Sequence, residues 1–116
     1  MNFNEYQKLS RRTMPNPVMV KIMRDVFDDK AKANYAMGLS GESGEVTDII
    51  KKEIFHGHQA DYTGIKKELG DVLHYLSGLA TMYGFTLEEI AIANIEKLKK
   101  RYPDGFSQEA SVNRID

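Results

Sequence analysis

Residues 61–83, DYTGIKKELGDVLHYLSGLATMY, decide the fold of this chain. Their large apolar residues recur every three or four positions, which is the spacing of one face of an α-helix, whereas a strand would show alternation. The residues of this apolar stripe are Ile65, Val72, Leu76, Leu79 and Tyr83. Gly84 follows the last of them and is suited to end a helix. The stretch therefore predicts one amphipathic helix over 61–83.

The sequence before this stretch predicts one long helix and two short ones. Residues 30–55 form the long helix, which should end at Gly57. Residues 3–12 predict a short helix that stops before Pro15, because a proline disfavours helix at the residue that precedes it. Residues 18–28 predict a further short helical piece. The apolar stripe of the long helix consists of Leu39, Val46 and Ile49.

The sequence after this stretch predicts a last helix that runs through residue 101. Thr86 and Glu89 have the spacing of a capping box, in which each side chain binds the backbone N–H of the other residue. We expect the helix to bury an apolar face formed by Leu87, Ile90, Ala91, Ile95 and Leu98. Short connections make neighbouring helices antiparallel, so we predict an all-α bundle of about four to five helices, completed by oligomerisation.

Length, charge and composition exclude several classes of protein. The chain has 116 residues and a formal net charge of −1. This length predicts one domain, which we assign to residues 1–106, with a polar tail over 107–116. Near-neutral charge argues against binding long nucleic acids. The absence of cysteine excludes disulfides, thiolate catalysis and Cys-based metal sites. No run of roughly 18 apolar residues or secretory signal occurs, so we expect a cytoplasmic protein without membrane contact.

Two pairs of acidic residues lie on the apolar stripes of the two longest predicted helices. Glu42 and Glu45 straddle the stripe of the first, and Glu68 and Asp71 fall along the stripe of the second. Because these helices are expected to be antiparallel neighbours, the four carboxylates would meet in their shared interior. Such burial costs many kcal/mol unless protons or cations neutralise the charges. The pattern therefore predicts a site for a divalent cation.

The ligand types at this site favour Mg²⁺, with Mn²⁺ as the alternative, because both prefer oxygen ligands and no Cys/His set is present for zinc. Gly41, Gly44 and Gly70 each lie near these acids, although glycine inside a helix costs about 1 kcal/mol relative to alanine. We therefore count these glycines as further support for a site at the acids; the competing interpretation is that they allow close helix packing, which would itself bring the acids together. The competing interpretation of the acids is that they form surface pairs with nearby lysines or favour the helix dipole.

Three polar residues of the last predicted helix suggest phosphate binding. Asn94, Lys97 and Arg101 share a face that borders the apolar stripe. Lysine and arginine bind phosphate oxygens, and asparagine can donate or accept a hydrogen bond near a metal. The alternative is that basic residues in a last turn complement the helix dipole. The carboxylates of the predicted cation site favour phosphate binding by these residues.

The three histidines are interpreted as residues that do not bind the cation. His56 and His58 flank Gly57 in a predicted turn, where exposed side chains are expected. His74 is rotated away from the stripe that carries the acids of its helix. We therefore expect His74 either to be partly buried with its hydrogen-bonding groups satisfied or to lie in an interface.

The acidic segments resemble the paired E-x-x-E and E-x-x-D signature of the MazG-like nucleotide pyrophosphohydrolases. They read GLSGESGEV over 38–46 and ELGD over 68–71. The segment NIEKLKKRYP over 94–103 is similar to the closing helix of that family. The resemblance covers roughly residues 37–106.

This resemblance implies an all-α protein that forms dimers or tetramers and hydrolyses nucleoside triphosphates to the monophosphate and pyrophosphate with Mg²⁺. The residues that it implies as metal ligands are Glu42, Glu45, Glu68 and Asp71, one of which orients the attacking water. Those that it implies as partners of the phosphates or of the metal site are Asn94, Lys97 and Arg101. The rival hypothesis is a non-catalytic helical interaction module with surface acids. A di-iron bundle is disfavoured because it needs Glu-x-x-His pairs.

Overall fold

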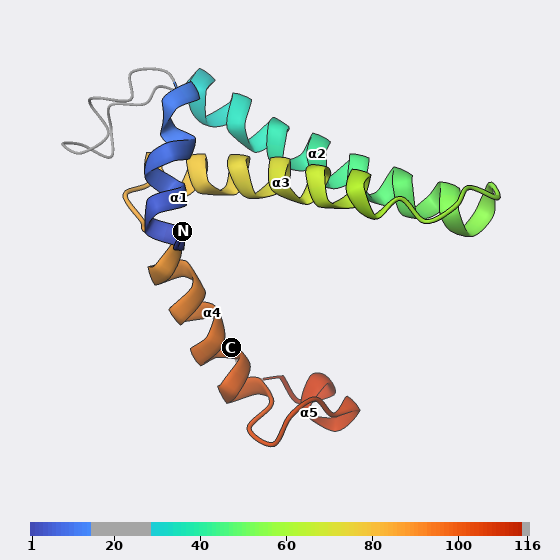
Figure 1. The fold of residues 1–116 in the computed structure, drawn as a ribbon. Coiled ribbons are helices and arrows are strands. Elements are labelled where there is room, and N and C mark those ends of the chain that lie inside the picture. The colour runs from blue at the N-terminus through green and yellow to red at the C-terminus, as the bar shows by residue number, and fades with distance from the viewer. Residues whose placement is uncertain (15–28, 115–116) are drawn as a thin grey trace.

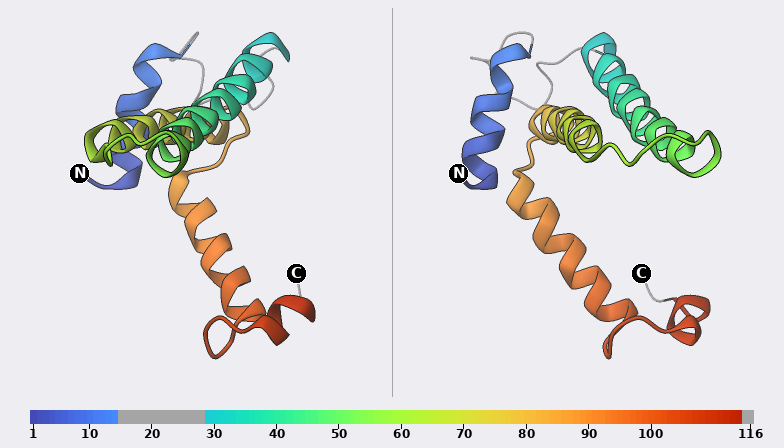
Figure 2. Two further views of the ribbon diagram at one scale, coloured as in Figure 1. Left: turned by 90° about the vertical axis from the view of Figure 1, so that its right-hand side faces the viewer. Right: turned by 45° about the vertical axis from the view of Figure 1, so that its right-hand side comes forward.

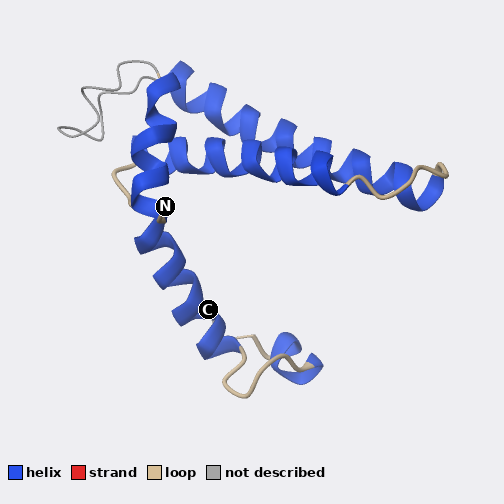
Figure 3. Cartoon of the chain, viewed as in Figure 1, coloured by secondary structure: helices blue, strands red, loops and turns tan. Residues whose placement is uncertain are grey.

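A computed structural model of the chain describes residues 1–14 and 29–114. Within these ranges the chain is helical and contains no strand, which confirms the predicted all-α class. The elements are α1 (Phe3–Ser10), the 3₁₀ turn η1 (Arg11–Thr13), α2 (Asp29–Phe55), α3 (Tyr62–Met82), α4 (Leu87–Arg101) and α5 (Gln108–Val112), as Figures 1 and 3 show. The helical piece predicted over 18–28 lies outside the described residues.

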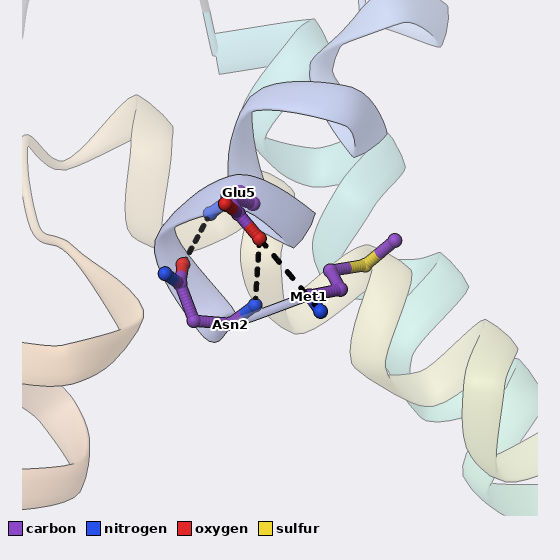
Figure 4. Close-up of polar contacts among 3 residues, drawn as sticks. All are labelled: Met1, Asn2 and Glu5. Carbon is purple, nitrogen blue, oxygen red and sulfur yellow. Dashed lines mark hydrogen bonds and ion pairs between the residues drawn. The ribbon is translucent and has the colours of Figure 1, made fainter.

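Local capping explains where these helices begin. At α1, the Asn2 side chain accepts from the backbone N–H of Glu5, and the Glu5 carboxylate accepts from that of Asn2, both at 2.9 Å (Figure 4). The capping box predicted for α4 is confirmed, with Thr86 and Glu89 bound reciprocally. Asp61 caps α3 by accepting from the Gly64 N–H at 2.8 Å. Side chains therefore satisfy orphan N–H groups at the start of each of these helices.

The long helices α2 and α3 run side by side in opposite directions and form a helical hairpin (Figures 1 and 2). The turn between them contains Gly57, whose positive φ of 72° is readily adopted by glycine. At the other end of the hairpin, Met14, Tyr35 and Met82 form the buried core, and Met82 is 0% exposed. Ala31, Tyr75 and Leu79 pack against this core. The predicted antiparallel pairing is confirmed for these two helices.

The Gln7 side chain holds α1 against the corner between α3 and α4. Its Nε2 donates to Thr81 Oγ1 at 3.1 Å and to the carbonyl oxygen of Phe85 at 2.8 Å. Its Oε1 accepts from the backbone N–H of Leu87 at 3.0 Å. One amide thus joins three segments and fixes the direction in which α4 leaves this corner.

The burial predicted for α4 is wrong within a single chain. Of the expected inward residues, only Leu87 is buried, whereas Ile90, Ile95 and Leu98 are 38%, 50% and 39% exposed, and Ala91 is also exposed. Figure 2 shows the reason: α4 projects away from the α2–α3 hairpin. The radius of gyration is 17.3 Å, against about 13 Å for a compact domain of this length. The described residues, 1–14 and 29–114, do not close a bundle by themselves.

The segment expected to be a polar tail contains a short helix. Ser107 caps α5 by accepting from the Ala110 N–H at 3.0 Å, and the positive φ of Gly105, 87°, turns the chain between α4 and α5. Five residues of helix leave too little periodicity to be recognised from the sequence.

Candidate functional site

The α2–α3 pairing brings three of the four predicted acids together. One carboxylate oxygen from each of Glu42, Glu68 and Asp71 can be chosen so that all lie within 4.8 Å of one another. Glu42 comes from the middle of α2, whereas Glu68 and Asp71 occupy successive turns of α3. The side chains of Glu42 and Glu68 are half-buried, and Asp71 is exposed. Two antiparallel helices therefore supply an oxygen cluster that opens to solvent.

The electrostatics of this cluster favour a bound cation. Partial burial raises the pKa of Glu68 above its ordinary value, and the hydrogen bond with Glu42 raises it further. The negative charges of Glu42, Asp71 and Glu45 act on the Glu68 pKa in the same direction. All of these causes disfavour a fully ionised, unpartnered cluster, and a cation would reverse them.

The expectation of four buried carboxylates needs correction. Glu45 and Asp71 are exposed, and Glu45 lies outside the group of three while remaining close enough to affect Glu68. The reason is geometric, because a pair of helices buries one seam, and among the described helices no third one packs along the middle of this hairpin (Figure 1). The acids lie at the edge of that seam.

The donor set fits Mg²⁺ or Mn²⁺. Each residue of the cluster offers carboxylate oxygen, which these hard cations prefer, and none of them offers nitrogen or sulfur. Because one side of the cluster is open, coordination positions would remain for water or for phosphate oxygens of a substrate. Glu42, Glu68 and Asp71 are the residues that would hold the ion.

The three polar residues predicted on α4 lie elsewhere in the single chain. Asn94 and Lys97 are exposed beside an apolar hollow, and Arg101 is half-buried at the end of the helix. Because α4 packs against α1 and extends away from the hairpin, one chain does not bring these residues to its own acids (Figures 1 and 2).

The glycines beside the acids are not points of close helix packing among the described residues. An added Cβ at Gly41, Gly44 or Gly70 would meet nothing within 4 Å, so the competing interpretation of these three is wrong there. The close approaches occur at Gly38 and Gly78, which face tyrosine rings of the opposite helix. Sequence reasoning missed both, although each lies one turn from a tyrosine of its own helix.

The histidines have the exposure predicted for them. The Nδ1 atom of His74 lies 2.7 Å from Ser10 Oγ, and its half-buried ring contacts Tyr35 and Tyr75. His56 and His58 are exposed in the turn at the tip of the hairpin. None of the three histidines belongs to the acid cluster.

Comparison of the sequence with known proteins identifies the family of this chain. The model of the MazG nucleotide pyrophosphohydrolase domain matches residues 30–106, a range that contains α3, α4 and all of α2 except its first residue. The chain belongs to the MazG family. A MazG-family assignment agrees with the resemblance of the paired acidic segments, and the match extends through the closing helix and the turn after it.

This MazG-family chain is also similar to a phage protein. It is 33% identical over 82 residues to the Gene 37 protein of Mycobacterium phage L5. The aligned region covers 67% of this chain and 72% of that protein. No solved structure matches the chain. Among the described helices, none has the length and apolar character needed to cross a membrane.

Proposed function

We propose that this MazG-family protein hydrolyses nucleoside triphosphates to the nucleoside monophosphate and pyrophosphate in a Mg²⁺-dependent reaction, which Mn²⁺ also supports. The observation that carries the proposal is the cluster of Glu42, Glu68 and Asp71, whose oxygens converge within 4.8 Å on two antiparallel helices. Family membership supplies the reaction class, and the oxygen-only cluster supplies the reason for a hard divalent cation.

In this proposal the four acids have two different roles. Glu42, Glu68 and Asp71 would hold the cation, which supplies neutralisation of the triphosphate and polarisation of its α-phosphorus when bound. Glu45, predicted as a fourth ligand, is exposed next to this group, and we assign its carboxylate to orienting water. The water oxygen forms a bond to the α-phosphorus, and Glu45 accepts the proton. The bond from the α-phosphorus to the bridging oxygen breaks, and pyrophosphate leaves with the electron pair.

We propose that a second copy of the chain completes the site. The exposed face of α4, with Ile90, Ile95 and Leu98, is an apolar surface of the kind that protein contacts cover. In a dimer or tetramer, Asn94 and Lys97 of one copy would reach the phosphates held at the acids of another, with Arg101 as a further phosphate contact. This arrangement accounts for basic residues that the single chain leaves away from its own acids.

The test replaces individual acids without changing side-chain size. We expect Glu42→Gln and Asp71→Asn to abolish Mg²⁺-dependent pyrophosphate release over a panel of natural and modified nucleoside triphosphates. The matched control is Glu53→Gln, an exposed acid of the same helix outside the cluster, which should retain wild-type turnover. Wild-type turnover in either cluster variant would contradict the site, and nucleoside diphosphate products would contradict cleavage at the α-phosphate.

Thermal melting separates this proposal from a non-catalytic interaction module. A cation that binds only the folded chain must raise the melting temperature. We expect millimolar Mg²⁺ to stabilise the wild type and not Glu68→Gln. A chain without this stabilisation and without pyrophosphate release would be a helical interaction module.

A further inference from the structure

The end of the α2–α3 hairpin opposite its turn, which we call the base, contains a reciprocal glycine–tyrosine contact. A Cβ added to Gly38 on α2 would overlap the ring of Tyr75 on α3, and a Cβ added to Gly78 on α3 would overlap the ring of Tyr35 on α2. The two rings contact each other edge to face, with centroids 5.2 Å apart and planes at 71°. Each helix therefore places a ring where the other helix has no side chain. We call these four residues the interlock.

The rings of the interlock have little room to move. Tyr35 is only 4% exposed and packs with Met14 and Met82 in the core. Tyr75 is half-buried and lies against the ring of His74 at 5.1 Å between centroids. We therefore expect a larger residue at Gly38 to push α2 and α3 apart, because the Tyr75 ring that it would meet already lies against the rings of Tyr35 and His74.

The acid cluster lies on the next helical turn. Glu42 follows Gly38 by four residues on α2, and Asp71 precedes Tyr75 by four residues on α3. An α-helix rises about 5.4 Å per turn and is stiff over that length. The separation of the two helices at the interlock is therefore transmitted directly to the distances between the carboxylates.

We propose that the interlock of Tyr35, Gly38, Tyr75 and Gly78 positions the carboxylates of α2 and α3 at cation-binding distance. These are positioning residues, because they touch no reacting atom and act through Glu42, Glu68 and Asp71. The inference rests on the proposed function, in which those three acids hold the cation. It explains why the acids of α2 and α3 lie close together although Gly41, Gly44 and Gly70 beside them are not points of close packing.

The experiment uses Mn²⁺ alone as the probe and measures its dissociation constant on the full chain by electron paramagnetic resonance. The variants are Gly38→Ala, the rescue Gly38→Ala with Tyr75→Leu, and Gly44→Ala as a control. The control makes the same chemical change on the same helix, where the new Cβ meets nothing within 4 Å. Helix content is followed by circular dichroism. Glu68→Gln shows whether binding depends on the cluster.

We expect Gly38→Ala to weaken Mn²⁺ binding by about tenfold or more, the loss seen when residues that orient metal ligands are changed. Gly44→Ala should bind as the wild type does, and removal of the Tyr75 ring should restore binding to Gly38→Ala. Unchanged binding in Gly38→Ala would overturn the inference, as would a folded double variant that does not regain binding. If Gly38→Ala does not fold, the double variant alone decides by the same criterion.

A distance measurement gives a readout that is independent of the metal. The chain contains no cysteine, so a spin-label pair at Thr47→Cys and Lys66→Cys, both exposed, reports the α2–α3 separation when the labelled chain is diluted with unlabelled chain. We expect Gly38→Ala to lengthen this distance and Gly44→Ala to leave it unchanged; an unchanged distance in Gly38→Ala would overturn the inference. Equal Mn²⁺ binding by wild type and Glu68→Gln would instead contradict the proposed function, so the two failures are distinguishable.

Discussion

The base of the hairpin and the α4 helix obey the same sequence rule with opposite outcomes. Both carry apolar residues at helical spacing, yet Met82 at the base is 0% exposed while Ile95 on α4 is 50% exposed. At the base, α2 and α3 supply each other with a partner surface. On α4, the described part of the chain buries Leu87, whose backbone N–H donates to the Gln7 side chain, but leaves most of the apolar face exposed. Periodicity thus identifies an apolar helix face, but it does not indicate whether the surface that buries this face belongs to the same chain.

The largest expected effect is on the stability of the base. Met82→Ala should lower the free energy of unfolding by about 2–5 kcal/mol, because it leaves a cavity in a fully buried position. The matched truncation Ile95→Ala should cost less than about 0.5 kcal/mol in dilute solution. Urea unfolding followed by circular dichroism measures both. A large cost of Ile95→Ala at low concentration would mean that a single chain buries this face.

A smaller effect is expected where α4 joins the rest of the molecule. Gln7→Ala removes three hydrogen bonds of one amide and should cost about 1–3 kcal/mol, since the Leu87 N–H loses its partner. Asn4→Ala, which removes one exposed bond to Glu88 at 3.3 Å, is the control and should cost far less. Equal melting temperatures for the two variants would show that Gln7 does not hold this corner.

A gain in stability is expected on the open side of the hairpin. Gly70→Ala places a methyl group where nothing lies within 4 Å and should stabilise α3 by about 1 kcal/mol. Denaturant unfolding of dilute protein measures this gain. Destabilisation by Gly70→Ala would reveal a close neighbour on the face that the single chain leaves open.

The smallest effect is expected at the exposed ion pairs of α2. Lys52 and then Lys51 hold the pKa of Asp48 below its ordinary value, with Nζ–Oδ distances of 2.8 and 3.2 Å. A lowered folded-state pKa stabilises the protein at neutral pH, and this stabilisation is lost as the pH falls through the lowered pKa. Asp48→Asn should therefore slightly lower the melting temperature at neutral pH and low salt. The difference should vanish in acid or in high salt; persistence under both conditions would contradict a Coulombic origin.

Local features of the sequence were sufficient to predict α1 to α4, although not α5. Thr86 with Glu89, Gly57 and Gly84 set helix boundaries within a residue or two of those found, because capping depends on neighbouring residues only. The convergence of Glu42 with Glu68 and Asp71 also followed, because antiparallel pairing places stripe residues opposite one another.

What could not be predicted depends on contacts between distant segments. Gly38 and Gly41 have the same identity in the same helix, and only the Tyr75 ring distinguishes them. The Gln7 amide finds partners more than 70 positions away, which no local pattern specifies. The exposure of Ile95 follows from the direction of α4, and that direction is set at the Gln7 corner.

The interlock has a consequence for how the turn at the hairpin tip can vary. Because the pairing of α2 with α3 is fixed at their base by Gly38 and Gly78, the connecting segment 56–61 does not have to determine which residues face each other. Lengthening a flexible loop costs little, about 0.6 kcal/mol for each doubling. Insertions between His56 and Asp61 should therefore be tolerated, and a whole additional peptide could be accommodated there without moving the acids.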